Sequence, residues 1–382
     1  MLHAIMQSSK ASPPNAQKPA PRPNRGLEGV IVADSVLTRV DGEAGVLLLR
    51  GHAIDEIAGQ RSFASIMHLL WTGEETDAAS EAALDLRLGQ ARSAAFELLP
   101  RLGDALHRED GMDALRAALS HLSAANGGGD AIQAVAAVAT FAAAWLRLQS
   151  GAAPLAPDPK LPHATDFLRM ALGQADATAA RAIDAYLATV MDHGMNASTF
   201  AARVVTSTGA DLISALVAGL GALKGPLHGG APGPVLDMLD AIGETGDVES
   251  WLRAELLAGR RIMGMGHRVY RVRDPRARVL ERQALLLAAD PRRQGRIELA
   301  RSVEACAERL LAERYPQRRL RANVEFYTAL VLEAVGLPRA AFTPTFAVGR
   351  VAGWCAHVDE ERREGRLIRP RARYTGRRAI KI

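Results

Sequence analysis

Three histidines of this sequence lie in glycine-containing turns, where their imidazoles could reach a bound ligand. They are His193 in DHGMN, His228 in GPLHGGAPG and His267 in GMGHRVY. Glycine lets the backbone approach a ligand closely because it has no Cβ, and histidine titrates near neutral pH. One such histidine is more often structural than functional, but three in the same setting favour a site. Their spacing is not that of metal ligands, so we expect no metal.

Arginines follow His267 in the same stretch, IMGMGHRVYRVRDPRAR. Asp274 followed by Pro275 predicts a helix start, with Asp as the N-cap and Pro at the first helical position. Arg276 would then lie in the first turn, where free backbone N–H groups already favour an anion. Arg271 is a further cation on the same loop. This arrangement suits a small polycarboxylate or a phosphate.

Two charged residues stand in apolar surroundings further along the chain. Glu325 in NVEFY opens a predicted helix, where a carboxylate often only complements the helix dipole. Its apolar neighbours favour a raised pKa and a role as a base instead. Arg350 is the single charge within FTPTFAVGRVAGWCAH; a buried guanidinium needs an anion, which could be a distant acid or a ligand. Arg369, in the basic segment RLIRPRARYTG, could belong to a solvated tail.

Together these groups predict a site with imidazoles, one carboxylate base and several arginines. Arginine binds carboxylates through two parallel hydrogen bonds and is therefore suited to a dicarboxylate. A carboxylate base beside neutral imidazoles suits proton removal next to a thioester carbonyl, and the enolate would attack a ketone. The sequence contains no nucleophile elbow, GxGxxG motif or P-loop, which argues against hydrolases, dehydrogenases and NTPases.

The elements that would position these residues are mostly helices. Short β-type runs occur at Val30–Ala33, Val36–Val40 and Val46–Arg50, with DGEAG as a turn between the last two. From there on, the apolar spacing is helical. The predicted helices are Ile54–Ala58, Ser62–Trp71, Asp77–Leu88, Ala91–Leu99, Met112–Ala124, Asp130–Gln149, Ala164–Ala171, Thr178–Met191 and Leu212–Leu223, with further helices capped by Asn196 and Asp274 and one that ends at Gly336. The loop NGGGD precedes Asp130–Gln149.

Composition is that of a soluble globular protein, with 48% hydrophobic and 23% charged residues. More than half of the 47 lysines and arginines follow position 250, which could reflect nucleic-acid binding, an anionic ligand or only a solvated surface. No alternation of aromatic and basic residues supports nucleic acid. The longest apolar run, Ala131–Leu146, is too short to span a bilayer. Two cysteines outside any CxxC motif favour a cytoplasmic protein.

In these motifs the sequence resembles the citrate synthase family, from about Gly26 to Gly376. The resemblance is carried by VDGEAGVLLLRG, GPLHGGAPGPVL, IMGMGHRVYRVRDPRA, NVEFYTALVLEAVG, FTPTFAVGRVAGW and IRPRARYTG, in the family's order. It implies an all-α homodimer with two domains and a short N-terminal β-hairpin. Residues 26–229 and 338–382 would form the large domain, and residues 230–337 a small domain that closes over substrate. Residues 1–25 are predicted to be a disordered leader rich in proline.

The resemblance also implies roles for single residues. His228 would donate a hydrogen bond to the thioester oxygen of acetyl-CoA while Glu325 removes a methyl proton. His267 would polarise the ketone of oxaloacetate. His193, Arg276 and Arg350 would hold its carboxylates, Arg369 would reach the partner subunit's site, and Arg271 would face the CoA phosphates. Hydrolysis of citryl-CoA would give citrate and CoA, in the tricarboxylic acid cycle, without a metal or a redox cofactor.

One position departs from the family pattern, which has NVDFY where this chain has NVEFY. Glutamate is one methylene longer than aspartate, so the carboxylate of Glu325 must be placed differently, and a shift of about an ångström can lower a rate on the order of 100-fold. Three enzymatic outcomes stay open: an ordinary citrate synthase, a 2-methylcitrate synthase that uses propionyl-CoA, and a repurposed paralogue. A basic helical scaffold that binds nucleic acid or protein is the non-enzymatic alternative.

Overall fold

The computed structural model describes residues 25–27, 29–122, 130–229, 232–267 and 269–377. The chain divides into two compact units, Met1–Ser35 and Val36–Ile382. The predicted leader, residues 1–25, lies outside the described residues except for Arg25, which begins the 3₁₀ turn Arg25–Leu27. The predicted strand Val30–Ala33 is wrong, since this segment forms no strand and pairs with no neighbour among the described residues. The predicted loop NGGGD also lies outside them, except for Asp130.

The second unit starts with a small antiparallel sheet of order β1-β2-β3. Thr38–Asp41 (β1) and Val46–Leu49 (β2) form the predicted hairpin, with Thr38 opposite Leu49. The carboxylate of Asp41 accepts a hydrogen bond from the N–H of Ala44 at 3.0 Å and holds the turn between the strands. His52–Ala53 (β3) was not predicted, because two residues carry no periodic signal.

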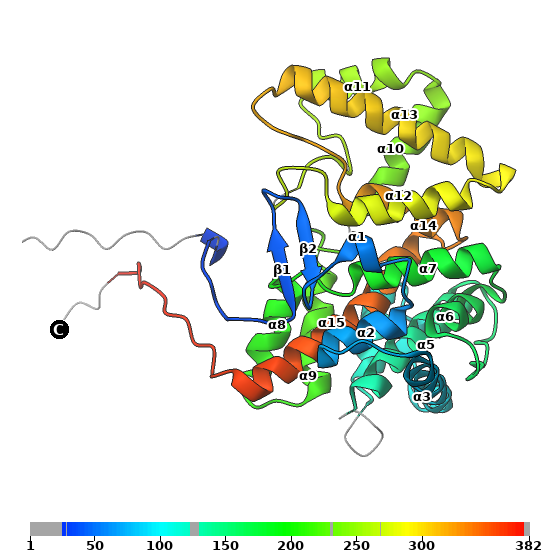
Figure 1. The fold of residues 1–382 in the computed structure, drawn as a ribbon, viewed down its shortest axis with the longest axis vertical. Coiled ribbons are helices and arrows are strands. Elements are labelled where there is room, and N and C mark those ends of the chain that lie inside the picture. The colour runs from blue at the N-terminus through cyan, green and yellow to red at the C-terminus, as the bar shows by residue number, and fades with distance from the viewer. Residues whose placement is uncertain (1–24, 28, 123–129, 230–231, 268, 378–382) are drawn as a thin grey trace, which may run out of the picture. The chain divides into compact units, whose positions relative to one another are not determined.

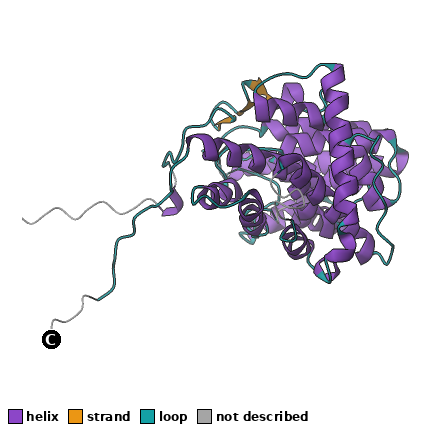
Figure 2. Ribbon diagram, turned by 90° about the horizontal axis from the view of Figure 1, so that it is seen from below, coloured by secondary structure: helices purple, strands orange, loops and turns teal. Residues whose placement is uncertain are grey.

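The rest of this unit is helical, as the sequence predicts (Figure 2). Most predicted starts coincide with side-chain caps, such as Ser62, Asp130, Asn196 and Asp211. The α-helices are α1 (Ile54–Ile57), α2 (Phe63–Thr72), α3 (Ala78–Glu97), α4 (Gly111–Leu119), α5 (Ala131–Gln149), α6 (His163–Leu172), α7 (Ala177–Val190), α8 (Ala197–Thr206), α9 (Leu212–Leu223), α10 (Pro232–Thr245), α11 (Val248–Leu257), α12 (Pro275–Leu287), α13 (Pro291–Arg314), α14 (Val324–Ala334) and α15 (Phe342–Glu364).

Three predicted helices were wrong in extent. The sequence predicts two separate helices, Asp77–Leu88 and Ala91–Leu99, but α3 runs without a break through Gly89. A Cβ on Gly89 would lie 2.2 Å from the carbonyl oxygen of Pro159, so this glycine permits close packing and is no helix end. The helix predicted at Met112–Ala124 ends at Leu119.

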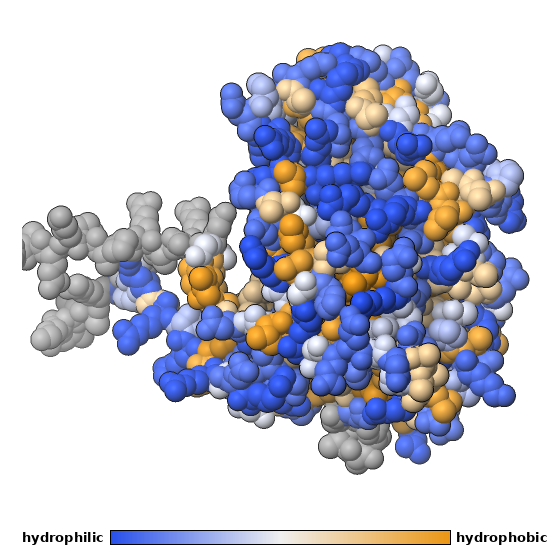
Figure 3. Space-filling view, viewed as in Figure 1, coloured by the Kyte–Doolittle hydropathy of each residue, from blue (hydrophilic) through white to orange (hydrophobic). Residues whose placement is uncertain are grey.

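The core is built around α5 and α15. Helix α5 is buried almost all round from Ile132 to Leu146, because alanines let its neighbours approach closely. By length and composition α5 is the one described helix that could cross a membrane, but most of it lies inside the protein, as in the core helix of a soluble protein. The face in Figure 3 is mainly hydrophilic, with hydrophobic residues in small scattered groups.

The helices that position the candidate residues meet in the middle of the second unit (Figure 1). Helix α12 packs against both α7 and α14, while α15 packs against α7, α8 and α9. Helices α11 and α13 pack on each other beyond α12. The all-α prediction is confirmed. That residues 230–337 form a separate, mobile domain stays a prediction.

Candidate active site

The loop before α12 is joined to the start of α14 by backbone hydrogen bonds. The N–H of Gly266 donates to the carbonyl oxygen of Arg321 at 2.7 Å, and that of Asn323 donates to the carbonyl oxygen of Gly264 at 2.9 Å. Gly264 has φ +73°, and a Cβ there would lie 2.8 Å from Phe326. Only glycine fits both the backbone conformation and the space. The loop that carries His267 and the helix that carries Glu325 therefore form one block.

His267 is held in one tautomer by this loop. Its Nδ1 accepts hydrogen bonds from the backbone N–H groups of Val269 at 3.0 Å and Tyr270 at 3.1 Å. Backbone N–H groups only donate, so the neutral ring carries its proton on Nε2. Burial, reinforced by the charge of Arg276, lowers the pKa of His267 to about 4. The ring is therefore neutral near pH 7.

Two donors converge beside His267. Its Nε2 lies 3.4 Å from Nη2 of Arg276, and since both atoms carry protons they cannot bond to each other. An acceptor oxygen close to both atoms would use both donors. This is the geometry for a carbonyl or carboxylate oxygen.

Arg276 lies in the first turn of α12, as predicted, and is 4% exposed. Its Nε and Nη2 donate to the two carboxylate oxygens of Asp274 at 3.1 and 2.8 Å. The carboxylate also accepts from the N–H of Arg276 at 3.0 Å and that of Val324 at 3.3 Å. Burial alone would lower the pKa of Arg276, but Asp274 outweighs burial and raises it. The guanidinium is thus charged and fixed in direction.

His193 lies in the turn between α7 and α8 and contacts Tyr270 and His267. Its Nε2 is 3.0 Å from the hydroxyl oxygen of Tyr270, and its ring centroid is 5.9 Å from that of His267. Burial and the charges of Arg276 and Arg350 hold the pKa of His193 well below its usual range. His193 is therefore also a neutral imidazole.

Asp192 supports the turn from inside the core. Its carboxylate accepts from the hydroxyl of Thr38 at 2.5 Å and from the N–H of Gly194 at 3.1 Å, and lies 3.2 Å from Nε2 of His357. Burial would raise the pKa of Asp192, but His357, Arg350 and Thr38 outweigh burial and lower it to about 2. The turn therefore rests on an ionised carboxylate.

His228 follows α9, where the sequence places it, and contacts α8. Its Nε2 lies 2.8 Å from the hydroxyl of Ser198, which also accepts from Nε1 of Trp354 at 3.2 Å. The ring meets Phe346 edge-on, with the centroids 6.4 Å apart. Burial, followed by the charge of Arg350, lowers the pKa of His228 to about 4.

Arg350 is 1% exposed and has no carboxylate partner within the described residues. Its Nε donates to the carbonyl oxygen of Val190 at 2.6 Å, and its guanidinium lies 4.8 Å from the ring centroid of Phe346. Burial lowers the pKa of Arg350 to about 10, although Asp192 opposes this. Within the described part of the chain Arg350 forms no salt bridge that would give it a structural role, which favours an anionic ligand as its partner.

Glu325 lies in the first turn of α14. Asn323 caps this helix, because its Oδ1 accepts a hydrogen bond from the backbone N–H of Glu325 at 3.0 Å. Burial raises the pKa of Glu325 to about 7, in the direction that the sequence predicts, and Arg276 and Arg350 only partly offset it. Its half-buried carboxylate makes no hydrogen bond or ion pair with the described residues. It is therefore available to remove a proton near neutral pH.

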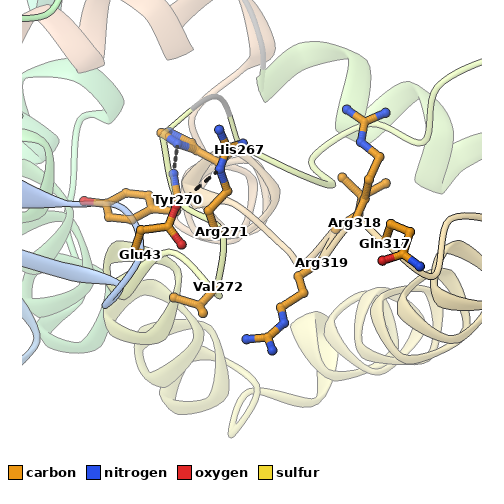
Figure 4. Close-up of a pocket in the computed structure, with 9 residues that line it drawn as sticks. Glu43, His267, Tyr270, Arg271, Val272, Gln317, Arg318 and Arg319 are labelled. Atoms are coloured by element: carbon orange, nitrogen blue, oxygen red, sulfur yellow. Dashed lines mark hydrogen bonds and ion pairs between the residues drawn. The ribbon is translucent and has the colours of Figure 1, made fainter. Parts of the chain in front are cut away.

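A cavity of about 470 Å³ lies next to His267 (Figure 4). Arg271 lines it together with Arg318 and Arg319, and Figure 4 shows these side chains around the same opening as Glu43. The β1–β2 turn contacts this wall, since the N–H of Arg271 donates to the carbonyl oxygen of Gly42 at 2.8 Å. Three arginines against one glutamate suit a phosphorylated ligand.

The structure thus brings together His193, His228, His267, Arg276, Glu325 and Arg350, with Arg271 in the adjoining cavity. Arg369 lies elsewhere: it is exposed, on an extended segment after α15. Four further residues that contribute to the site were not predicted: Tyr270, Ser198, Asp192 and Asn323. Asp192 and Ser198 flank His193 in DHGMNAS, and Asn323 precedes Glu325 as a helix cap would, so their positions carried a signal. Nothing in the sequence distinguishes Arg318 and Arg319 from the other basic residues that follow position 250.

Comparison with known proteins shows the family of this chain. Residues 26–371 match the family profile described as "Citrate synthase, C-terminal domain". This chain belongs to the citrate synthase family. It is 38% identical to a citrate synthase of Haloferax volcanii, over 93% of this chain and 96% of the relative. It is 35% identical to a 2-methylcitrate synthase of Mycobacterium tuberculosis, over 92% and 90%.

Solved citrate synthases have the same fold. The Thermotoga maritima enzyme superposes with a TM-score of 0.82 at 32% identity, covering 94% of this chain and 98% of that one. A ternary complex of carboxymethyl coenzyme A and oxaloacetate with citrate synthase from Thermoplasma acidophilum superposes with a TM-score of 0.84 at 28% identity, covering 94% and 98%.

Proposed function

We propose that this protein condenses acetyl-CoA with oxaloacetate and hydrolyses the product to citrate and CoA. In this reaction the acyl group becomes an alkyl group on transfer. The observation that carries the proposal is the pairing of a carboxylate whose pKa is about 7, Glu325, with neutral imidazoles whose pKa values are about 4, His228 and His267. The first can accept a proton at neutral pH, while the others can donate hydrogen bonds without being charged.

Oxaloacetate would bind among the arginines and His193. Arg350 has no carboxylate partner among the residues that the structure describes, and Arg276 is held in direction by Asp274, so each can hold one carboxylate group. The ketone oxygen would lie against Nε2–H of His267, where two donors already converge. This arrangement polarises the ketone before any bond forms.

Acetyl-CoA would place its thioester against His228. The single proton of Ser198 can go to Oδ1 of Asn196 or to Nε2 of His228, each 2.8 Å away. Asn196 Oδ1 already accepts two backbone N–H groups, so donation to His228 satisfies more acceptors. His228 then carries its proton on Nδ1 and can donate it to the thioester oxygen.

The chemical step moves one proton at each end. Glu325 removes a proton from the methyl carbon, and the electron pair of that bond forms the enol(ate) under His228. The carbon attacks the ketone carbon, and the resulting alkoxide takes the Nε2 proton of His267. The proton held by Glu325 then passes through water to His267, so that both side chains return to their starting protonation states. Water then cleaves the thioester of citryl-CoA, which releases CoA as a thiol. No metal or redox cofactor takes part in this proposal.

The CoA moiety would lie in the cavity lined by Arg271. Arg318 and Arg319 line the same wall, so the phosphates would meet three guanidiniums. We also propose that two copies form a homodimer in which Arg369, exposed on its extended segment, completes the site of the other subunit. Such a dimer would act in the cytoplasm, in the tricarboxylic acid cycle, without nucleic acid or membrane partners.

Release of thiol on mixing the protein with acetyl-CoA and oxaloacetate tests the proposal. A parallel reaction with propionyl-CoA tests 2-methylcitrate synthesis, which is favoured as a second candidate by the 35% identical 2-methylcitrate synthase and by Glu325. No thiol release with any short acyl-CoA would reject both functions and leave the scaffold alternative. Unchanged rates after treatment with a chelator would support a metal-free reaction.

The shared site has its own test. Mixing Arg369→Ala subunits with His228→Ala subunits should restore part of the activity, because one site of each mixed dimer would be intact. No recovery in mixtures shown to contain mixed dimers would reject sharing.

A further inference from the structure

Tyr270 contacts both imidazoles that flank the proposed oxaloacetate site. Its ring centroid lies 4.8 Å from that of His267 and 5.6 Å from that of His193. Its backbone N–H donates to Nδ1 of His267 at 3.1 Å, and its hydroxyl lies 3.0 Å from Nε2 of His193. One residue therefore bonds to a nitrogen of each ring.

The direction of the first hydrogen bond follows from its chemistry. A backbone N–H has no acceptor atom, so Nδ1 of His267 must be the unprotonated nitrogen. The N–H of Val269 donates to the same atom and gives the same answer. The proton of His267 is on Nε2, which faces Arg276.

The direction of the second hydrogen bond follows from burial. Tyr270 is 2% exposed, and among the described residues its hydroxyl has no hydrogen-bond partner except His193. If Nε2–H of His193 donated to the hydroxyl oxygen, the phenolic proton would have no acceptor in a buried place, which is unfavourable. If the hydroxyl donates to Nε2, both groups are satisfied and the proton of His193 lies on Nδ1. His193 is only half-buried, and its Nδ1 makes no hydrogen bond with the described residues.

We propose that Tyr270 is a positioning residue that sets the tautomers of two histidines, His193 through its hydroxyl and His267 through its backbone N–H. Both rings then present an N–H to the site, Nδ1–H from His193 and Nε2–H from His267. The site selects a ligand with acceptor oxygens on both sides, as a 2-oxo dicarboxylate has. This consequence for the ligand rests on the proposed function, whereas the tautomers themselves do not.

The test uses the unligated full-length protein and nitrogen-15 NMR of the imidazoles, whose two nitrogens differ strongly in chemical shift when one is protonated. The His193→Asn and His267→Asn variants assign the signals. The wild-type protein at pH 7.5 should show His193 protonated on Nδ1 and His267 on Nε2. In Tyr270→Phe, His193 should lose its preference for Nδ1–H, while His267 should be unchanged because the backbone N–H remains.

A wild-type His193 protonated on Nε2, or a His193 that Tyr270→Phe leaves unchanged, would overturn the proposal. Both readings are made without substrate, so they hold even if no thiol is released in the enzyme assay. If Tyr270→Phe changes the signals of both His267 and His193, the loop is misfolded. Tyr270→Trp, which keeps an N–H donor on an aromatic ring, then decides. The proposal is supported if His193 is again protonated on Nδ1 and is overturned if it is not.

Kinetics supply a second readout. Tyr270→Phe should raise the KM for oxaloacetate about tenfold, the factor for one lost hydrogen bond of ordinary strength, and leave the KM for acetyl-CoA unchanged. The matched control is Tyr315→Phe, which removes a hydroxyl that accepts from Nε of Arg314 at the surface end of α13. That variant should keep both constants. Equal increases in both KM values for Tyr270→Phe would contradict a role at His193.

Discussion

Asp274 and Arg276 repeat, inside the protein, a pairing that Asp290 and Arg292 make at its surface. In each Asp-Pro-Arg motif the aspartate caps a helix, and its carboxylate accepts from Nε and Nη2 of the arginine two residues later. Arg276 is 4% exposed, whereas the side chain of Arg292 is 86% exposed. The same local geometry therefore places an arginine in the candidate site at the start of α12, whereas at the start of α13 it only caps the helix.

Asp274→Asn should weaken oxaloacetate binding and destabilise the fold. Asparagine remains a good N-cap, so the change removes the charge and leaves Arg276 buried without its anion. Breaking a buried ion pair in this way costs roughly 3 kcal/mol. Chemical denaturation and the KM for oxaloacetate measure the two effects. Asp290→Asn is the matched control and should alter neither. Equal effects of the two variants would contradict a special role for the buried pair.

The rate should depend on pH through one carboxylate. Glu325 must be ionised to accept a proton, and its pKa is about 7. We expect kcat/KM for acetyl-CoA to fall tenfold per unit below pH 7 and to be flat above it, until the guanidinium of Arg350, with a pKa of about 10, loses its proton. His228 and His267 stay neutral throughout, because their pKa values are about 4. An acid limb centred near pH 4.5 would show that the pKa of the base is not raised, and an acid limb that persists in a still active Glu325→Gln variant would show that Glu325 is not the base.

Glu325→Gln should abolish turnover and stabilise the fold at alkaline pH. The pKa of Glu325 is about 7 in the folded protein against 4.5 for an ordinary glutamate, so the folded state binds more protons between these values. Stability is then lost as pH rises from 4.5 to 7, by about 3 kcal/mol. Glutamine removes this loss. Thermal unfolding should show the variant above wild type at pH 8 and level with it near pH 4.5. A variant that is less stable at pH 8 would contradict the raised pKa.

Glu325→Asp tests the one departure from the family pattern. Aspartate would withdraw the carboxylate by about an ångström from a site whose backbone is fixed by Gly264 and Asn323. We expect kcat to fall on the order of 100-fold while oxaloacetate binding is kept. Steady-state rates with acetyl-CoA and propionyl-CoA would measure the change. A variant that gains activity with acetyl-CoA alone would show instead that glutamate sets the acyl preference.

The helices and the hairpin could be predicted from the sequence better than the contacts between residues that lie far apart along the chain. Asn196 and Asp274 could be predicted as helix caps because a cap is a local interaction that involves residues three apart or fewer. The hairpin was predicted for the same reason, from Asp41 and its turn. The continuous helix through Gly89 was not predicted, because the group that explains this glycine, the carbonyl of Pro159, lies seventy residues away along the chain.

The same distinction applies to the site. The raised pKa of Glu325 could be predicted because its apolar neighbours adjoin it in sequence. Tyr270 could not be predicted to contact His193, since 77 residues separate them and only the packing of α12 against α7 brings them together. The partner of Arg350 could be either a distant acid or a ligand as far as the sequence shows. The structure favours a ligand, because no carboxylate among the described residues forms an ion pair with Arg350.

The hydrogen bonds that join Gly264 and Gly266 to Arg321 and Asn323 also affect how the site can come apart. His267, Arg276 and Glu325 lie on this joined block, while His193, His228 and Arg350 lie on α7–α9 and α15. A dicarboxylate held between the two groups would act as a removable cross-link. Substrate would then do more than occupy the site, because it would couple the local unfolding of one block to that of the other. Hydrogen exchange in both segments should slow together when oxaloacetate is added.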